Sequence, residues 1–395
     1  MEYFVVKYKT DTTEGSGGAK SAALEDSIMH KGRQVAAGSR MLDGFVSPID
    51  ATVVTKLETA GVDIIGKTGM DEFGVAGLFG DARTISGAVG AVADGLAGFA
   101  LVNDYAGAIA CRAASDGLCC IRPTYGTVSR YGLIPAVSSM DQIGVIAKDP
   151  EDCFRILDII AGFDEKDGAM LPDSVKGSTQ NGNQLSGAGG AAHSYNEVGS
   201  KPPILGVPMN AVYNNKEQSS KEAIAGFGKH FATTDIELPY LDVYPQVMQI
   251  LCCAEFGSNI SRYDGIKFGH RAGDYANLHE LYTKSRTEAF GAEAKLTALI
   301  GAMVLSRDNY MKYYDKAMRS RRLIISSLDW NSYDVILMTA NKDFMTGEQQ
   351  LGYRALPRLC GLPSITFPFC GVEATLIAGP GREHTLSAVL KKVGI

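Results

Sequence analysis

Gly66-Lys67-Thr68-Gly69-Met70-Asp71-Glu72-Phe73 begins the stretch that decides the fold of this chain. A second block, Val102-Asn103-Asp104-Tyr105-Ala106-Gly107-Ala108-Ile109, follows it, and the stretch closes with Asp141-Gln142-Ile143-Gly144. Apolar runs alternate in it with glycine-rich turns, and glycine lets one backbone segment approach another closely. Buried strands that alternate with helices are typical of layered α/β proteins. The stretch therefore predicts an α/β/α fold around one large mixed sheet.

Hydrophobic periodicity outside this stretch predicts further elements of the same kind. Helices are expected over 50–61, 150–162, 217–233 and 310–325, and strands over 1–7, 62–66, 203–207 and 362–368. Residues 11–20 and 174–201 are rich in glycine and small polar residues, so we expect flexible loops there. No internal repeat is present, and we predict a single domain over residues 1–395.

Composition narrows the class of protein. The chain has 395 residues, of which 45% are hydrophobic, and this is enough to bury a large core. Its net charge of −6 argues against a basic surface for nucleic acid, so no direct nucleic-acid contact is expected. The N-terminus lacks the apolar segment of an export signal, and glycine or charge interrupts the longest apolar runs. We therefore expect a cytoplasmic protein with no membrane contact.

The eight cysteines also favour a location in the cytoplasm. Most lie inside apolar runs and no C-x-x-C pair occurs, which is typical of buried, reduced thiols. The six histidines show no metal-ligand spacing near them. The sequence predicts neither a metal nor a cofactor.

The order of the blocks between residues 66 and 144 resembles the amidase signature family, and within it the A subunits of glutamyl-tRNA(Gln) amidotransferases, which liberate ammonia from glutamine. Residues 263–270, 280–291 and 362–368 extend the resemblance over nearly the whole chain. The resemblance implies that most of a helical N-terminal region is missing. Its loss would alter any contact with a C-subunit-like partner.

The resemblance also locates the family's Ser–cisSer–Lys triad. The lysine motif, of the form Ile-Lys-Asp-Asn, matches Leu24-Glu25-Asp26-Ser27, which places Glu25 at the lysine position. The run that holds the nucleophile matches residues 103–109, which places Ala108 at the nucleophile position. Thr84 falls at the cis-serine position, and the 24 positions between Thr84 and Ala108 equal the family's spacing.

These three replacements lead us to expect a pseudo-amidase that acts as a structural or regulatory subunit. Alanine has no oxygen with which to form an acyl-enzyme, and a carboxylate cannot replace the neutral amine that serves as base. The former oxyanion turn would be Tyr105-Ala106-Gly107, where the phenol of Tyr105 could fill part of the pocket.

Two other functions remain open at this point. A divergent amidase or glutaminase would need another nucleophile, and the candidates are Ser86, Ser138, Ser139 and Cys111. Lys67 is a weak substitute for the lost base, because the family's second lysine belongs to a strand end. A small-molecule binding protein could instead use the former acyl pocket, with Asp104, Arg321 and Asn309 as candidate ligand contacts.

Other residues in the matched motifs have structural interpretations. We expect Asp104 to cap a turn, and we expect 122–126 and 141–144 to hold the edge of the sheet. Arg321 would then be an exposed helix arginine, and Asn309 replaces a tyrosine of the family's glutamine site. Because 263–269 and 281–291 persist although the triad does not, we expect a protein partner or a homo-oligomer.

Overall fold

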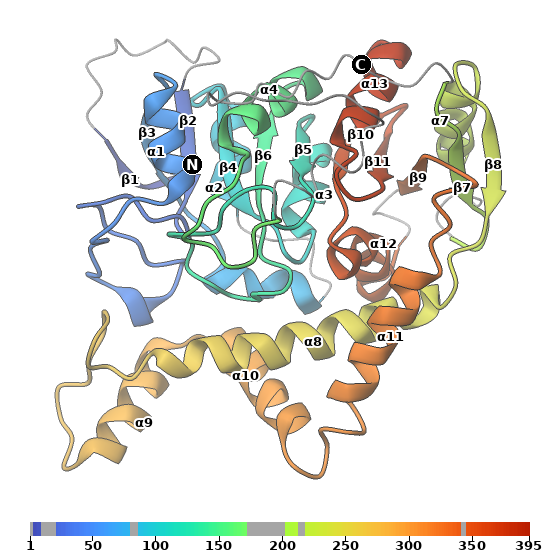
Figure 1. The fold of residues 1–395 in the computed structure, drawn as a ribbon. Coiled ribbons are helices and arrows are strands. Elements are labelled where there is room, and N and C mark those ends of the chain that lie inside the picture. Colours follow the sequence, from blue (N-terminus) through green and yellow to red (C-terminus); the bar gives the residue numbers. More distant parts are fainter. Residues whose placement is uncertain (1–2, 9–20, 80–85, 172–201, 212–217, 341–344) are drawn as a thin grey trace.

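The computed structural model describes residues 3–8, 21–79, 86–171, 202–211, 218–340 and 345–395. The expected loops at 11–20 and 174–201 lie outside the described residues, and so does Thr84. Figure 1 shows an upper body built around a sheet, with the long helix α8 (Tyr244–Asn259) running beneath it. Helices α9 and α10 lie below α8 in this view, and α11 rises past its right-hand end.

The described strands form one mixed, 11-stranded sheet in the order β1-β3-β2-β4-β6-β5-β10-β11-β9-β7-β8. Parallel pairing joins β2 to β3 and β4, and β7 to β8 and β9, while the other neighbours are antiparallel. The strands are β1 (Phe4–Lys7), β2 (Ser21–Glu25), β3 (Asp63–Thr68), β4 (Phe99–Asn103), β5 (Cys119–Arg122), β6 (Ile143–Ala147), β7 (Leu205–Pro208), β8 (Thr233–Ile236), β9 (Val335–Ala340), β10 (Ser364–Phe369) and β11 (Val372–Ala378).

Helices cover both faces of this sheet, as the alternation within β4 shows. Phe99 and Leu101 pack into one apolar cluster, and Ala100 and Val102 pack into another. The first cluster contains residues of α1 (Thr52–Thr59), α4 (Pro150–Ile160), α7 (Gln218–Gly228) and α13 (Glu383–Val393). The second contains residues of α2 (Gly87–Ala93) and α3 (Ala108–Ser115). The expected α/β/α fold around a large mixed sheet is confirmed.

A third apolar cluster lies around α8. It adds residues of α9 (Leu278–Ala289), α10 (Ala292–Leu305), α11 (Tyr314–Ser326) and α12 (Gly347–Cys360). The core consists of the two apolar clusters on the faces of the sheet and this third cluster. Every helix in the described parts of the chain is too short or too polar to span a lipid bilayer.

The predicted elements are largely confirmed, and their observed bounds lie within about three residues of the expected ones except in two helices. The helix expected over 217–233 ends at Gly228, because β8 begins at Thr233 and pairs with β7. The helix expected over 310–325 begins at Tyr314, after a turn in which Lys312 N and Tyr313 N donate to Asn309 O.

One prediction about the sheet is wrong. Residues 122–126 and 141–144 do not hold its edge, because β5 and β6 are interior strands. The turn before Ala108 likewise follows β4, which lies between β2 and β6. A strand's own sequence does not specify its neighbours, and here β5 is placed inside the sheet by its pairing with β10 (Ser364–Phe369), which comes from a distant part of the chain. The motifs therefore meet at the ends of central strands.

Candidate ligand site at the ends of the central strands

Glu25 is the last residue of β2 and Asn103 is the last residue of β4, which runs parallel to β2. The ends of these two strands are tied together through one carboxylate oxygen. Glu25 Oε2 accepts from Asn103 N at 3.0 Å and from Ser27 Oγ at 2.6 Å. The other oxygen, Oε1, is buried and has no hydrogen-bond partner among the described residues. Glu25 thus presents one satisfied oxygen and one that is available to a ligand.

The environment of Glu25 favours its protonated form. Burial raises the pKa of Glu25 to about 7, although the hydrogen bonds from Ser27 and Asn103 oppose the change. The charges of Asp104 and Asp26 contribute to this raised pKa. Close to neutral pH this group therefore exists both as a carboxylate and as a neutral acid.

Lys67 lies on the neighbouring strand β3, where it pairs with Leu24 of β2. Its side chain is fully buried, and Nζ has no hydrogen-bond partner in the described part of the chain. Burial lowers the pKa of Lys67 to about 8, against the opposite influence of Asp26 and Glu25. Asp26 accepts instead from Ala36 N at 3.1 Å and from Gly38 N at 3.4 Å. The charges of Asp26 and Glu25 therefore act on Lys67 from a distance.

After β4 the chain turns sharply into α3. Asp104 Oδ1 accepts from Ile109 N at 3.1 Å, and Oδ2 accepts from Ala110 N at 3.0 Å. These bonds satisfy amides in the first turn of the helix, which have no partner within it. Arg358 Nη2 also donates to Asp104 Oδ2 at 3.0 Å. The expected capping role of Asp104 is confirmed, and both of its carboxylate oxygens are engaged.

Gly107 makes this turn possible. It has φ of 80° and precedes Ala108, the first residue of α3. A Cβ added at Gly107 would lie 2.7 Å from Arg354 Cβ and 2.9 Å from Arg358 Cζ. Both the left-handed backbone and the close approach of α12 therefore require glycine.

A small pocket joins the end of β2 to this turn. It is lined by Glu25, Met70, Asp71, Gly74, Asn103, Asp104, Tyr105, Ala106, Ala108 and Ile109. Tyr105 is buried, and its hydroxyl donates to Phe73 O at 3.0 Å, so the ring forms a fixed part of the wall. The pocket thus combines the protonatable carboxylate of Glu25 with the methyl group of Ala108 at the start of α3.

The other candidate nucleophiles contribute nothing to the lining of this pocket, as the described residues define it. Ser86 caps α2 by accepting from Val89 N, and Ser139 Oγ donates to Glu255 Oε1 at 2.6 Å. Ser138 Oγ accepts from Asn259 Nδ2 at 3.0 Å. Cys111 Sγ donates to Glu373 Oε1 at 3.0 Å, and burial raises the pKa of this thiol.

Arg321 and Asn309 also lie away from the pocket. Arg321 is partly buried, and it donates to Leu359 O at 2.6 Å and to Ser139 Oγ at 2.8 Å. It is therefore not the exposed arginine that the sequence suggested, because it ties α11 to the end of α12 and to a loop. Asn309 Nδ2 donates to Ser306 Oγ within its own turn.

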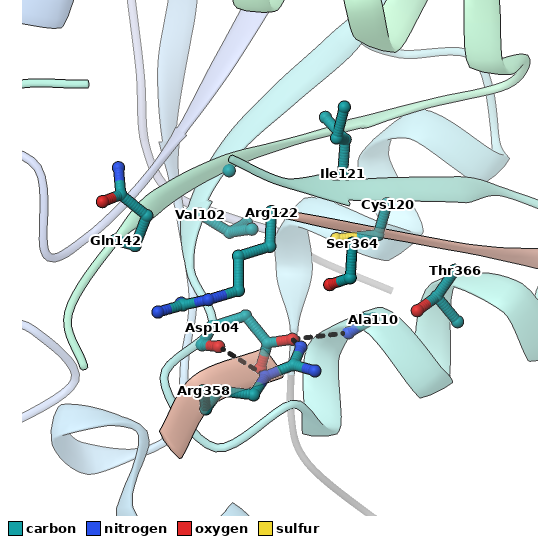
Figure 2. Close-up of a pocket in the computed structure, with 11 residues that line it drawn as sticks. Val102, Asp104, Ala110, Cys120, Ile121, Arg122, Gln142, Arg358, Ser364 and Thr366 are labelled. Carbon is teal, nitrogen blue, oxygen red and sulfur yellow. Dashed lines mark hydrogen bonds and ion pairs between the residues drawn. The ribbon is translucent and has the colours of Figure 1, made fainter. Parts of the chain in front are cut away.

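Sequence reasoning missed the arginines that surround the turn. Arg354 and Arg358 lie one helical turn apart in α12 and are both buried, as is Arg122 at the end of β5. The available signal was the position of the two α12 arginines among apolar residues such as Leu356 and Leu359. Figure 2 shows Arg122 and Arg358 around a second cavity, with Asp104 near both.

Comparisons with known proteins agree with the fold. The model of the family described as "Amidase" matches residues 22–78 and 86–380. The chain is 38% identical over 325 residues to the A subunit of the glutamyl-tRNA(Gln) amidotransferase of Cupriavidus taiwanensis. That match covers 76% of this chain and 64% of the relative, so the chain spans just under two thirds of the length of that protein. The corresponding protein of Symbiobacterium thermophilum is 34% identical, over 93% of this chain and 80% of the relative.

Solved structures are similar as well. The crystal structure of the A subunit of the glutamyl-tRNA(Gln) amidotransferase of Thermotoga maritima has a TM-score of 0.70 and 25% identity, and the match covers 97% of this chain and 85% of that chain. The peptide amidase PAM in complex with the inhibitor chymostatin has the same TM-score of 0.70 at 22% identity, over 94% of this chain and 82% of that chain, and supports the fold alone.

Proposed function

This chain belongs to the Amidase family, and from that premise we propose that it is a pseudo-amidase that acts as a structural or regulatory subunit. The observation that carries the proposal is Ala108. The methyl group of Ala108 lines the pocket, and the resemblance assigns this position to the nucleophile of the family. The whole chain would form one amidase signature domain.

The chemistry of acyl transfer supports this proposal. An acyl-enzyme needs a nucleophilic atom within hydrogen-bond reach of a base. Ala108 supplies no such atom, and Glu25 occupies the position matched to the basic lysine. Ser27 is the hydroxyl bound to Glu25, but it is absent from the lining of the pocket, as far as the described residues define that lining. This arrangement supports the proposal that the chain does not hydrolyse amides.

The names of the relatives support the role as one component of a complex. The curated relatives are named as subunits of an amidotransferase, so those proteins work with partners. We propose that this chain also assembles, either with a protein partner or with a second copy. All eight cysteines are free, which is consistent with assembly in the cytoplasm.

A second candidate function is the binding of a small molecule in the former acyl pocket. The Oε1 atom of Glu25 favours it, because a buried oxygen without a partner among the described residues can accept a hydrogen bond from a ligand. Ligand-dependent stabilisation in thermal melts would separate a binder from a scaffold.

The test of the main proposal is an assay for ammonia release from glutamine, asparagine and simple aryl amides by the purified chain. We expect no turnover above the rate of a buffer blank. Turnover that stays with the protein through successive chromatography steps would instead favour amide hydrolysis by a divergent amidase. Ser27→Ala, Ser86→Ala and Cys111→Ala would then identify the nucleophile.

A further inference from the structure

Arg122 lies at the end of an interior strand, and much of its guanidinium has no partner. It pairs with Ser364 of β10 across the sheet and is 3% exposed. Its Nη2 atom donates to Met140 O at 2.9 Å. The Nε and Nη1 atoms are buried without a hydrogen-bond partner among the described residues. Buried donors of this kind are rare in folded proteins, and each one needs an explanation.

Arg122 also forms no salt bridge with any of the described residues. Asp104 forms its salt bridge with Arg358, at 3.0 Å. Asp141 accepts from Asn103 Nδ2 at 2.9 Å and from the amides of Ala136 and Val137. Both carboxylates lie close enough to influence the charge of Arg122, but their hydrogen bonds go to these other donors.

The electrostatics agree with this geometry. Burial, together with the neighbouring charge of Arg358, lowers the pKa of Arg122 to about 9, against the opposite influence of Asp104 and Asp141. An isolated buried cation is unfavourable unless it is paired. A second cation beside it increases the need for a negative charge.

A small cavity lies against both arginines. Figure 2 shows its lining, in which Asp104, Ser364, Thr366 and Gln142 are polar. The remaining residues are apolar or weakly polar, namely Val102, Ala110, Cys120, Ile121 and Gly144. Asp104 is the one acid among these lining residues, and Arg358 already neutralises it. The space is therefore positive, enclosed and small.

We propose that this cavity is a buried site for a small inorganic anion, chloride in the cell, held by the available N–H groups of Arg122. A halide ion would accept from Nε and Nη1 and would form with Arg122 the direct ion pair that Asp104 and Asp141 do not form. Water could satisfy the same donors, but it would not form an ion pair. The lining of this site shares Asp104, and no other described residue, with the pocket that contains Glu25 and Ala108.

The test uses the purified chain in thermal melts. Sodium chloride and sodium bromide are compared with sodium gluconate at equal ionic strength, because gluconate is too large for the cavity. We expect a saturable rise in Tm with either halide and none with gluconate. Arg122→Met should abolish the rise, whereas Arg319→Met should retain it, because the Arg319 side chain is 72% exposed.

A crystal soaked in bromide gives a second readout that does not depend on a variant that folds. We expect an anomalous peak in contact with Arg122 Nε and Nη1. A single ordered water at that place, together with equal melting in chloride and gluconate, would overturn the proposal.

Discussion

Glu25 Oε2 lies 2.6 Å from Ser27 Oγ, and both residues are buried at the end of β2. The same oxygen accepts from Asn103 N, so β2 and β4 are joined through a side chain beyond the point where their backbone pairing ends. This arrangement places a titrating group inside the core. Its protonation state therefore influences folding.

The first prediction concerns pH. The folded pKa of Glu25 is about 7, above the ordinary value of 4.5, so the folded state retains a proton that the unfolded state loses. Between these two values the free energy of unfolding should fall as pH rises, by at most about 1.4 kcal/mol for each pH unit. Urea titrations at pH 4.5, 5.5, 6.5 and 7.5 measure the change.

Glu25→Gln removes the titration and should flatten the profile over this window. Glu222→Gln, at an exposed glutamate of α7, should leave the profile as in the unmodified chain. A profile that is the same for the unmodified chain and for Glu25→Gln would show that Glu25 does not titrate near neutral pH.

The second prediction concerns the buried ion pair of Asp104 and Arg358. Asp104→Ala leaves Arg358 buried without its partner and removes the cap of α3. We expect a loss of roughly 3–5 kcal/mol in the free energy of unfolding. Asp116→Ala breaks the exposed pair with Arg112 at the other end of α3 and should cost less than about 1 kcal/mol. Equal losses in the two variants would contradict the assignment.

The third prediction separates two reasons for glycine. Gly107 and Gly117 have nearly the same φ, 80° and 81°, but a Cβ at Gly117 would meet nothing within 4 Å. Gly117→Ala should therefore cost about 1 kcal/mol from backbone conformation alone. Gly107→Ala must also displace Arg354 and Arg358, so its loss in denaturant titrations should be at least twice as large. Similar losses would mean that α12 adjusts without strain.

The sequence predicted most of the elements and part of the site, and the difference has a physical cause. The apolar spacing in 50–61 and in 150–162 is a local pattern, which local physics converts into helices. Asp104 was predicted as a cap for the same reason. The order of the strands is not local, and it brings Arg358 to Asp104 across 254 positions. Neither the central place of β5 nor the cavity beside Arg122 could be inferred from short motifs.

The fourth prediction concerns reactivation. Ala108→Ser places a hydroxyl at the start of α3, while Glu25 remains at the position that the proposed assignment gives to the base. We expect this variant to release no ammonia from glutamine above the blank, because no lysine is among the described residues that line the pocket and could take the proton of the serine. Ala108→Ser combined with Glu25→Lys is the matched comparison. Turnover by Ala108→Ser alone would reveal another base in the pocket.

The last prediction concerns assembly. The chain shares its fold with proteins named as subunits, and its own surface carries apolar side chains at helical spacing on α10. Leu296, Leu299 and Met303 are 46%, 68% and 42% exposed, which is unusual for large apolar residues that serve no contact. A stable interface needs roughly 1,000 Å² or more of complementary surface. Light scattering should therefore give a mass above the 42.1 kDa of one chain, either alone or in a complex reconstituted from purified partners.

Leu299→Asp should reduce that mass, whereas Leu278→Asp on α9, at 55% exposure, is the control. A chain that stays monomeric at every concentration and forms no complex would contradict this role in assembly, and the binding of a small molecule would then be the better explanation of the retained fold.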